Sequence, residues 1–177
     1  MTAPLNRHIQ VNLIEMVKEK LLLERITLNG VDVNHRDSEG KNALYWAIQR
    51  RSTYNANLLV SFGSSLMVTE KKHALFHAIE CEHHEMVVLL IKKGLDINMT
   101  DNYGKTILMY AIEAEVFETV KFLITQGADM YLMDDALNMA EDYAKTSNSK
   151  LIQLYLQHIV YTDMNKGTCQ TKQCMCG

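Results

Sequence analysis

Three residues spaced four apart could bind a metal ion or perform thiol chemistry. His73, His77 and Cys81 would lie on one face of a helix, and His84 follows shortly after them. Imidazole and thiolate groups are the ligands that Zn²⁺ prefers in proteins. A cysteine beside a histidine is also the pair that activates a thiol nucleophile. The spacing alone therefore leaves open a zinc site and a thiol enzyme.

A second group of thiols lies in the last nine residues of the sequence. Cys169, Cys174 and Cys176 could bind a metal, form a disulfide or carry a lipid. The last four residues, Cys-Met-Cys-Gly, match the prenylation pattern C-a-a-X in form, although neither the second cysteine nor the terminal glycine is typical of it. We therefore keep lipidation of Cys174 as an alternative to a flexible tail of little structural consequence.

The composition and the charge exclude several classes of protein. The chain has 177 residues, of which 47% are hydrophobic and 22% charged, as in an ordinary globular domain. A net charge of −3 without a basic stripe argues against nucleic-acid binding. The longest apolar run, at 87–91, is too short to span a bilayer. The N-terminal segment has no apolar signal-peptide core, and the four cysteines do not form a disulfide framework, so we expect an intracellular, cytoplasmic protein.

The elements that must hold these residues follow from a repeat. The chain contains only 8 Gly and 1 Pro, which favours helices over a turn-rich β fold. Four glycines are spaced by 33, 31 and 33 residues, namely Gly30, Gly63, Gly94 and Gly127. Four alanines are spaced by 31, 33 and 33 residues, namely Ala47, Ala78, Ala111 and Ala144. Because two residue types keep one register, we interpret the chain as a set of repeats.

Each repeat contains two apolar segments and a turn. The first segments lie at 42–48, 73–79 and 106–112, and the second segments lie at 57–60, 86–91 and 120–124. The glycine after each second segment stands where a helix ends in the left-handed conformation. The turn sequence Asp-x-x-Gly occurs at 37–40 and 101–104. Each repeat is therefore predicted to be two helices and a turn-rich loop, which we call a finger.

This pattern resembles the ankyrin repeat, which has a 33-residue period and a T-P-L-H-x-A signature. The resemblance is best at 94–128 and extends from about Gly30 to His158. It implies an all-α solenoid of stacked helix pairs with β-hairpin-like loops, with about three full repeats and a capping element at each end. We place N-terminal capping helices at 1–30, the repeat stack at 31–158 and a tail at 159–177. The repeat units lie near 37–67, 68–100, 101–133 and 134–158.

The chain departs from the family pattern at two kinds of turn. The loop before the second unit is two residues short and has Val68 and Lys71 where the pattern has Asp and Gly, so we expect its finger to be retracted or irregular. The glycine usual between paired helices is replaced by Arg51, Glu82 and Glu115. Each lost turn glycine should lower the stability by about 1 kcal/mol.

The register of the repeats favours a structural role for the histidine cluster. His73 falls at the start of a first helix, His77 at a buried apolar position and His83 in the turn between paired helices. A catalytic pair of Cys81 with a histidine has no third group to orient it. We therefore expect no metal, no cofactor and no catalysis, and we keep a metal-dependent or thiol enzyme that uses Cys81 as an alternative.

The resemblance implies that the chain binds a protein partner. In ankyrin repeats the finger tips and the exposed faces of the first helices line a concave groove that binds proteins. Carried onto this sequence, that surface comprises Arg36, Ser38, Glu39, Lys41, Gln49, Arg50, Thr69, Glu70, Lys72, Glu80, Cys81, Asn102, Tyr103, Lys105, Glu113, Met133 and Asp135. We favour Tyr103 and Arg50 as anchors, because Tyr and Arg dominate interface hot spots.

The function expected from the sequence is thus a non-catalytic protein–protein interaction module. It would act as an adaptor, as an inhibitor or as a secreted bacterial effector that reaches the host cytosol. We expect a monomer that binds no nucleic acid and has no transmembrane segment. The alternative is the same module tethered to a membrane through lipidation of Cys174.

Overall fold

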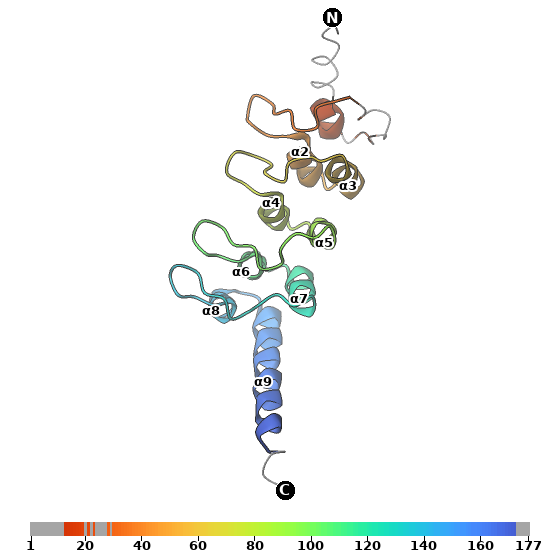
Figure 1. Cartoon of the computed structure of the whole chain (residues 1–177). Helices are drawn as coiled ribbons and strands as arrows, with labels where there is room; N and C mark the ends of the chain where they lie inside the picture. The colour runs from red at the N-terminus through yellow and green to blue at the C-terminus, as the bar shows by residue number, and fades with distance from the viewer. Residues whose placement is uncertain (1–12, 20, 22, 24–27, 29, 173–177) are drawn as a thin grey trace, which may run out of the picture. The chain divides into compact units, whose positions relative to one another are not determined.

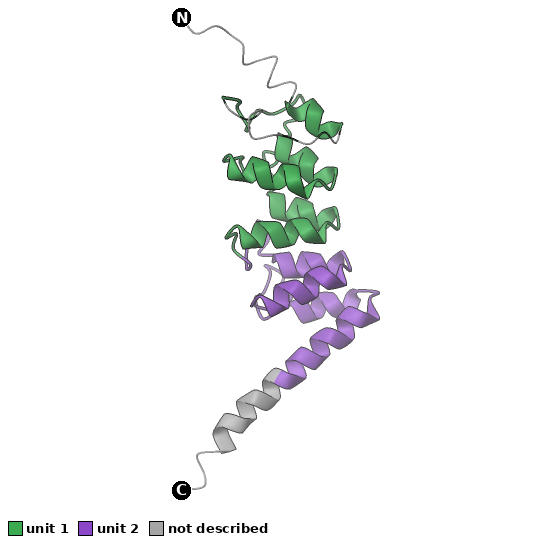
Figure 2. Cartoon of the chain, turned by 90° about the vertical axis from the view of Figure 1, so that its right-hand side faces the viewer, with its two compact units in different colours: residues 1–96 green, residues 97–177 purple. Residues whose placement is uncertain are grey.

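The computed structural model describes residues 13–19, 21, 23, 28 and 30–172, with side chains as far as residue 162 (Figure 1). The chain divides into two compact units, unit 1 (residues 1–96) and unit 2 (residues 97–177) (Figure 2). Within the described ranges the regular structure is helical, and β structure is confined to isolated bridges. The all-α fold expected from the sequence is confirmed in these ranges.

Unit 1 contains two pairs of helices, preceded by a helical segment at 13–18. The pairs are α2 (Ala43–Gln49) with α3 (Thr53–Ser61) and α4 (Ala74–Glu80) with α5 (His84–Lys92). The first helices α2 and α4 pack on each other, and so do the second helices α3 and α5. Each pair follows a finger that an antiparallel bridge closes. The first finger (36–42) is closed between Arg36 and Asn42, and the second finger (67–73) between Met67 and His73.

Unit 2 contains α6 (Ile107–Glu113) with α7 (Phe117–Thr125) and α8 (Ala140–Thr146) with α9 (Lys150–Lys172). Helix α6 packs on α8, and α7 contacts α9. The third finger (100–106) is closed by a bridge between Thr100 and Thr106, and the fourth finger (133–139) precedes α8. Because α9 has 23 residues, the end of the stack predicted at residue 158 falls inside a helix.

The repeated alanines and leucines are buried, as the sequence predicts. They are Ala47, Ala78, Ala111, Ala144, Leu44, Leu75 and Leu108. A seven-residue helix is marginal in isolation, so packing against neighbouring helices supplies most of its stability. Side-chain caps begin these helices. Asn42 Oδ1 accepts a hydrogen bond from the N–H of Tyr45 at 2.9 Å, and Thr106 Oγ1 accepts one from the N–H of Met109 at 3.2 Å.

The second helices end at a glycine in the left-handed conformation, with φ of 82° at Gly63 and 92° at Gly127. After α3, the N–H of Gly63 donates to the carbonyl of Val60 at 3.1 Å, and the N–H of Ser64 donates to that of Leu59 at 3.0 Å. This pair of hydrogen bonds is the Schellman motif, which requires the positive φ at its glycine. The predicted role of the repeated glycines is therefore confirmed.

The first helices α2, α4 and α6 end in the same conformation without a glycine, whereas α8 ends at Ser147 with a φ of −68°. Arg51, Glu82 and Glu115 have φ of 58°, 51° and 56°, which costs a residue with a Cβ atom about 1 kcal/mol. Two of these side chains bind the corresponding turn of the next repeat. Arg51 Nη1 donates to the carbonyl of Cys81 at 3.0 Å, and Glu115 Oε1 accepts from the N–H of Asn148 at 2.6 Å. These contacts offset part of the cost expected from the missing glycines.

Candidate functional site

One carboxylate holds the first finger. Asp37 Oδ1 accepts hydrogen bonds from the N–H groups of Glu39 and Lys41, both at 3.0 Å. Its other oxygen accepts from Trp46 Nε1 at 2.9 Å. Because Trp46 belongs to α2, the network ties the finger to the first helix of its repeat. Ser38 and Glu39 remain exposed at the tip.

The third finger has the same arrangement in unit 2. Asp101 Oδ1 accepts hydrogen bonds from the N–H groups of Tyr103 at 2.8 Å and Lys105 at 2.9 Å. Asp101 Oδ2 accepts from the hydroxyl of Tyr110, on α6, at 2.8 Å. The carboxylate thus fixes the finger backbone, while the side chain of Tyr103 is 74% exposed at the tip.

The fourth finger contains a further copy of the network. Asp134 Oδ1 accepts hydrogen bonds from the N–H groups of Ala136 at 2.9 Å and Asn138 at 2.8 Å, and its Oδ2 accepts from the hydroxyl of Tyr143 at 2.6 Å. Leu137 stands where the first and third fingers have a glycine, and its φ is 64°. A bulky residue is an outlier in that conformation.

Hydrogen bonding keeps these carboxylates ionised. Burial raises the pKa of Asp37 and of Asp101, but the hydrogen-bond donors around each lower it by more, so both pKa values lie below the usual range. The hydroxyl of Tyr143 is the main cause of the lowered pKa of Asp134. Burial and the hydrogen bond to Asp134 raise the pKa of Tyr143. The three networks are therefore intact at neutral pH.

These Asp–aromatic pairs go beyond the prediction from the sequence, which gives the aspartates a turn role and Trp46 a packing role. Their signal in the sequence is a constant step of nine residues from aspartate to aromatic ring, at 37/46, 101/110 and 134/143. The second finger breaks this pattern, because Val68 and His77 stand at the two positions.

The second finger is built around a buried Val68. Thr69 Oγ1 takes the place of the carboxylate and accepts hydrogen bonds from the N–H groups of Lys71 at 3.3 Å and Lys72 at 3.1 Å. An open cleft of about 640 Å³ lies between the first and second fingers. Its lining includes five predicted partner-binding residues, namely Arg36, Ser38, Glu39, Thr69 and Glu70.

His77 belongs to a cluster on the first helices of unit 1. The residue is 3% exposed, and its ring stacks on that of Tyr45 with centroids 4.1 Å apart. Cys81 Sγ lies 3.8 Å from His77 Nε2, and Glu80 Oε2 lies 3.7 Å from His77 Nδ1. Burial lowers the pKa of His77 and raises the pKa of Cys81. A neutral imidazole therefore lies beside a protonated thiol, which differs from the thiolate of an activated nucleophile.

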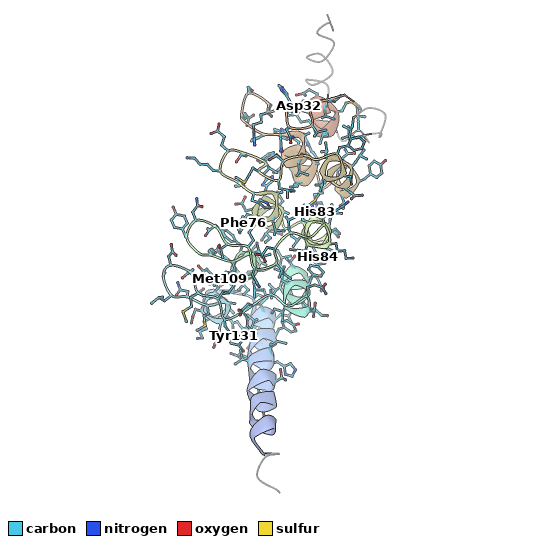
Figure 3. The ribbon with its side chains drawn as sticks, viewed as in Figure 1. Asp32, Phe76, His83, His84, Met109 and Tyr131 are labelled. Atoms are coloured by element: carbon cyan, nitrogen blue, oxygen red, sulfur yellow. The ribbon has the colours of Figure 1, made fainter. Side chains whose placement is uncertain are left out.

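The neighbouring histidines take the positions that the repeat register predicts. His73 is the N-cap of α4, where its Nδ1 accepts a hydrogen bond from the N–H of Leu75 at 3.2 Å. His83 is buried at the N-cap of α5, and His84 begins that helix (Figure 3). Among the residues that the structure describes, no group of three or more His, Cys, Asp or Glu could hold a metal ion.

The C-terminal cysteines lie outside the part of the chain whose side chains are described. Cys169 belongs to α9 by its backbone, whereas Cys174 and Cys176 follow the last described residue. Lipidation of Cys174 therefore stays a prediction. In the described ranges, every helix is too short or too polar to cross a membrane.

Several predicted partner-binding residues make ion pairs within their own repeat. Three pairs, each at 2.6 Å, join Lys41 to Glu39, Lys72 to Glu80 and Lys105 to Glu113. Lys105 Nζ also lies 4.3 Å from the ring centroid of Tyr110. The glutamates of these pairs are exposed to water, so their charges remain available to a partner.

The remaining predicted residues are exposed on the two units. They are Gln49 and Arg50 on unit 1, and Asn102, Tyr103, Met133 and Asp135 on unit 2. The tips of the third and fourth fingers touch, because the N–H of Asp135 donates to the carbonyl of Tyr103 at 2.9 Å. The structure thus brings predicted residues together within each unit, between the first and second fingers and between the third and fourth.

A comparison with known families matches residues 55–134 to ankyrin repeats (3 copies). The match begins in α3 and ends in the fourth finger. Ankyrin repeats generally mediate protein–protein interaction, and the family is typically non-catalytic. The helix pairs, the fingers and this match lead to one conclusion: residues 55–134 of the chain are ankyrin repeats.

Proposed function

We propose that this chain is a non-catalytic adaptor, inhibitor or effector that binds one protein partner in the cytoplasm through its finger tips and the exposed residues of its first helices. The observation that carries the proposal is the Asp–aromatic network of the fingers. It fixes the backbone of the first, third and fourth fingers while Ser38, Asn102 and Tyr103 stay exposed at the tips.

Rigid fingers favour binding because a loop that is already ordered loses little conformational entropy when a partner associates. The lowered pKa values of Asp37 and Asp101 keep their networks ionised at neutral pH. Affinity then comes from side chains at the tips that are not buried in the fold, above all Tyr103.

The cleft of unit 1 has the composition of a protein-binding site. Its lining residues are charged or polar apart from Gly40 and carry both signs of charge, as in Arg36, Glu39, Glu70 and Lys71. Small-molecule pockets are mostly apolar with a few polar groups, so this lining favours a partner's polar side chains. The protonated Cys81 thiol supports the same conclusion, because a binding module needs no activated nucleophile.

Affinity capture from a cell lysate with a double variant tests the proposal. Arg50→Ala with Tyr103→Ala removes one exposed anchor from each unit, and neither change alters the core. We expect recovery of the main partner to fall at least about tenfold. Tyr54→Ala is the matched control, because Tyr54 is 54% exposed but lies on the second helix α3. Equal recovery with the wild type and the double variant would refute the finger-tip assignment.

A further inference from the structure

Leu137 combines two unfavourable features. The residue is 74% exposed to water, and its φ of 64° is a conformation that glycine adopts without strain. Neither feature helps the fourth finger to fold, because the glycines of the first and third fingers form the same turn. Local backbone strain is often retained at functional sites. The leucine therefore points to a role outside the fold of unit 2.

A second exposed apolar side chain stands on the adjoining finger tip. Tyr103 is 74% exposed, and its carbonyl accepts the hydrogen bond from the N–H of Asp135 at 2.9 Å. The two tips approach so closely that a Cβ atom added to Gly104 would lie 3.2 Å from Asp134 Cα. The third and fourth finger tips, which carry Tyr103 and Leu137, are thus held in place relative to each other.

Further exposed apolar side chains lie on the segment that leads into the fourth finger. Met133 is 53% exposed, and Tyr131, just before the finger, is 54% exposed (Figure 3). Single exposed apolar residues are common on protein surfaces, but a group of them marks an interaction site. We call Tyr103, Tyr131, Met133 and Leu137 the tip group.

The tip group belongs to a strongly acidic part of the chain. Residues 101–145 contain nine Asp or Glu and three Lys, a net charge of −6, whereas the whole chain carries −3. Lys145 pairs with Glu141 at 3.2 Å and with Asp142 at 3.1 Å. Asp129 and Asp135 are exposed on the same segment as Met133 and Leu137. Lys105 is paired with Glu113 at 2.6 Å. Asp129 and Asp135 therefore place negative charge beside the exposed apolar side chains.

We propose that the third and fourth fingers bind a partner segment in which Lys or Arg residues flank an apolar side chain. The inference rests on the proposed function and deepens it by naming the chemistry of the partner. Leu137 and Tyr103 contact the apolar side chain, and the exposed carboxylates of Asp129 and Asp135 attract the basic ones. An acidic segment would be repelled, and a purely apolar segment would leave the carboxylates desolvated without a partner.

Selection from a random peptide library displayed on phage, with the full chain as bait, tests this inference. We expect the enriched peptides to carry a net positive charge and at least one apolar or aromatic residue between basic ones. A synthetic copy of the best peptide is then measured by fluorescence anisotropy. Its affinity should fall about tenfold when the salt concentration rises from about 50 to about 300 mM, because salt screens exposed charges.

Leu137→Gly isolates the apolar contact, because it leaves every charge in place. We expect it to weaken peptide binding at least about tenfold and to raise the Tm, since glycine relieves the positive φ. Asp135→Asn should weaken binding and reduce its salt dependence. Tyr54→Ser, which removes an exposed ring from α3 in unit 1, is the matched control and should leave binding unchanged.

The outcomes that contradict the inference do so in different ways. Unchanged peptide affinity in Leu137→Gly would show that the tip group does not bind, and enriched peptides without a basic bias would overturn the proposed chemistry. Peptides of another composition that lose binding in the Arg50→Ala, Tyr103→Ala variant would refute only the chemistry and would support the proposed function. Absence of enrichment, or binding that no finger variant changes, would refute both.

Discussion

At the scale of single residues, the aspartate that begins a finger binds two elements at once. Asp101 Oδ1 accepts hydrogen bonds from N–H groups of its own finger, as any turn aspartate can. Its Oδ2 accepts a hydrogen bond from the hydroxyl of Tyr110 on α6. The second bond fixes the direction of the finger relative to the helix. Hydrogen bonds to a charged acceptor are stronger than neutral ones, so the aromatic partner should contribute measurably to stability.

We expect Tyr110→Phe to lower the free energy of unfolding by about 1 kcal/mol, because the ring stays packed while Asp101 loses a hydrogen bond. Chemical denaturation followed by circular dichroism at neutral pH measures the change. The matched control is Tyr131→Phe, which removes the hydroxyl of a ring on a residue that is 54% exposed and should not move the midpoint. A midpoint for Tyr110→Phe equal to that of the wild type would show that the hydroxyl contributes nothing.

The lowered pKa of Asp101 predicts how stability depends on acid. A carboxyl whose pKa is lower in the folded state binds fewer protons there, so its contribution is fully present above the unfolded-state pKa of about 3.9 and is lost as the pH falls through the folded-state pKa. We expect Asp101→Asn to reduce the slope of stability against pH below about pH 4. Asp32→Asn, at a residue with no finger network, is the comparison, and a slope unchanged from the wild type in Asp101→Asn would contradict the prediction.

At the scale of helices and turns, both helices of the pairs α2–α3, α4–α5 and α6–α7 end in the same left-handed conformation, but only the second helices use glycine. Arg51 and Glu115 use their side chains to bind the corresponding turn of the next repeat, at 3.0 and 2.6 Å. Glu82 has the same conformation, with a φ of 51°. The three positions therefore carry the same backbone strain, and at Arg51 and Glu115 a hydrogen bond of the side chain offsets part of it.

Glycine substitution at these turns should separate the cost of the positive φ from the stability that the side-chain contact contributes. We expect Glu82→Gly to raise the free energy of unfolding by about 0.5 to 1 kcal/mol, since glycine accepts the positive φ. Arg51→Gly relieves the same strain but loses the hydrogen bond to Cys81, so it should gain less or be destabilising. The denaturation midpoints of the two variants, each compared with that of the wild type, measure the two gains. Equal gains for both would mean that the Arg51 contact adds no stability.

The sequence predicts these elements as far as their causes are local. The glycines at helix ends and the buried alanines follow from backbone conformation and a fixed period, and both are confirmed. The contact of Arg51 with the Cys81 carbonyl depends on which turn lies across the neighbouring repeat, so sequence spacing alone does not reveal it. The exposed Tyr103 follows from the repeat register, whereas the strain at Leu137 emerges only from the network of its finger.

At the scale of the whole molecule, the two units differ in charge and in titration. Unit 1 has twelve basic and eleven acidic residues, a net charge of +1, whereas unit 2 has six and ten, a net charge of −4. The histidines whose pKa is lowered by burial all lie in unit 1, namely His73, His77 and His83. The fold of unit 1 therefore depends on neutral imidazoles in a way that the described part of unit 2 does not.

A histidine with a lowered folded-state pKa binds fewer protons in the folded state than in the unfolded state. Its contribution to stability is fully present above the unfolded-state pKa of about 6.5 and is lost as the pH falls from there through the folded-state pKa. His77 faces Tyr45, Glu80 and Cys81, and of these the carboxylate of Glu80 opposes the loss by favouring the charged ring. Burial outweighs that effect, so unit 1 should be destabilised in mild acid.

We expect unit 1 to lose stability before unit 2 when the pH falls from about 7 to about 5. Trp46, the only tryptophan, lies in unit 1, so its fluorescence reports that unit, while far-UV circular dichroism reports both. The denaturant midpoint measured by Trp46 should fall more than the midpoint measured by circular dichroism. His77→Phe keeps an aromatic ring against Tyr45 and removes one titrating group, so it should reduce this difference. Equal shifts of the two signals in the wild type would show that burial of these histidines does not set the acid response of unit 1.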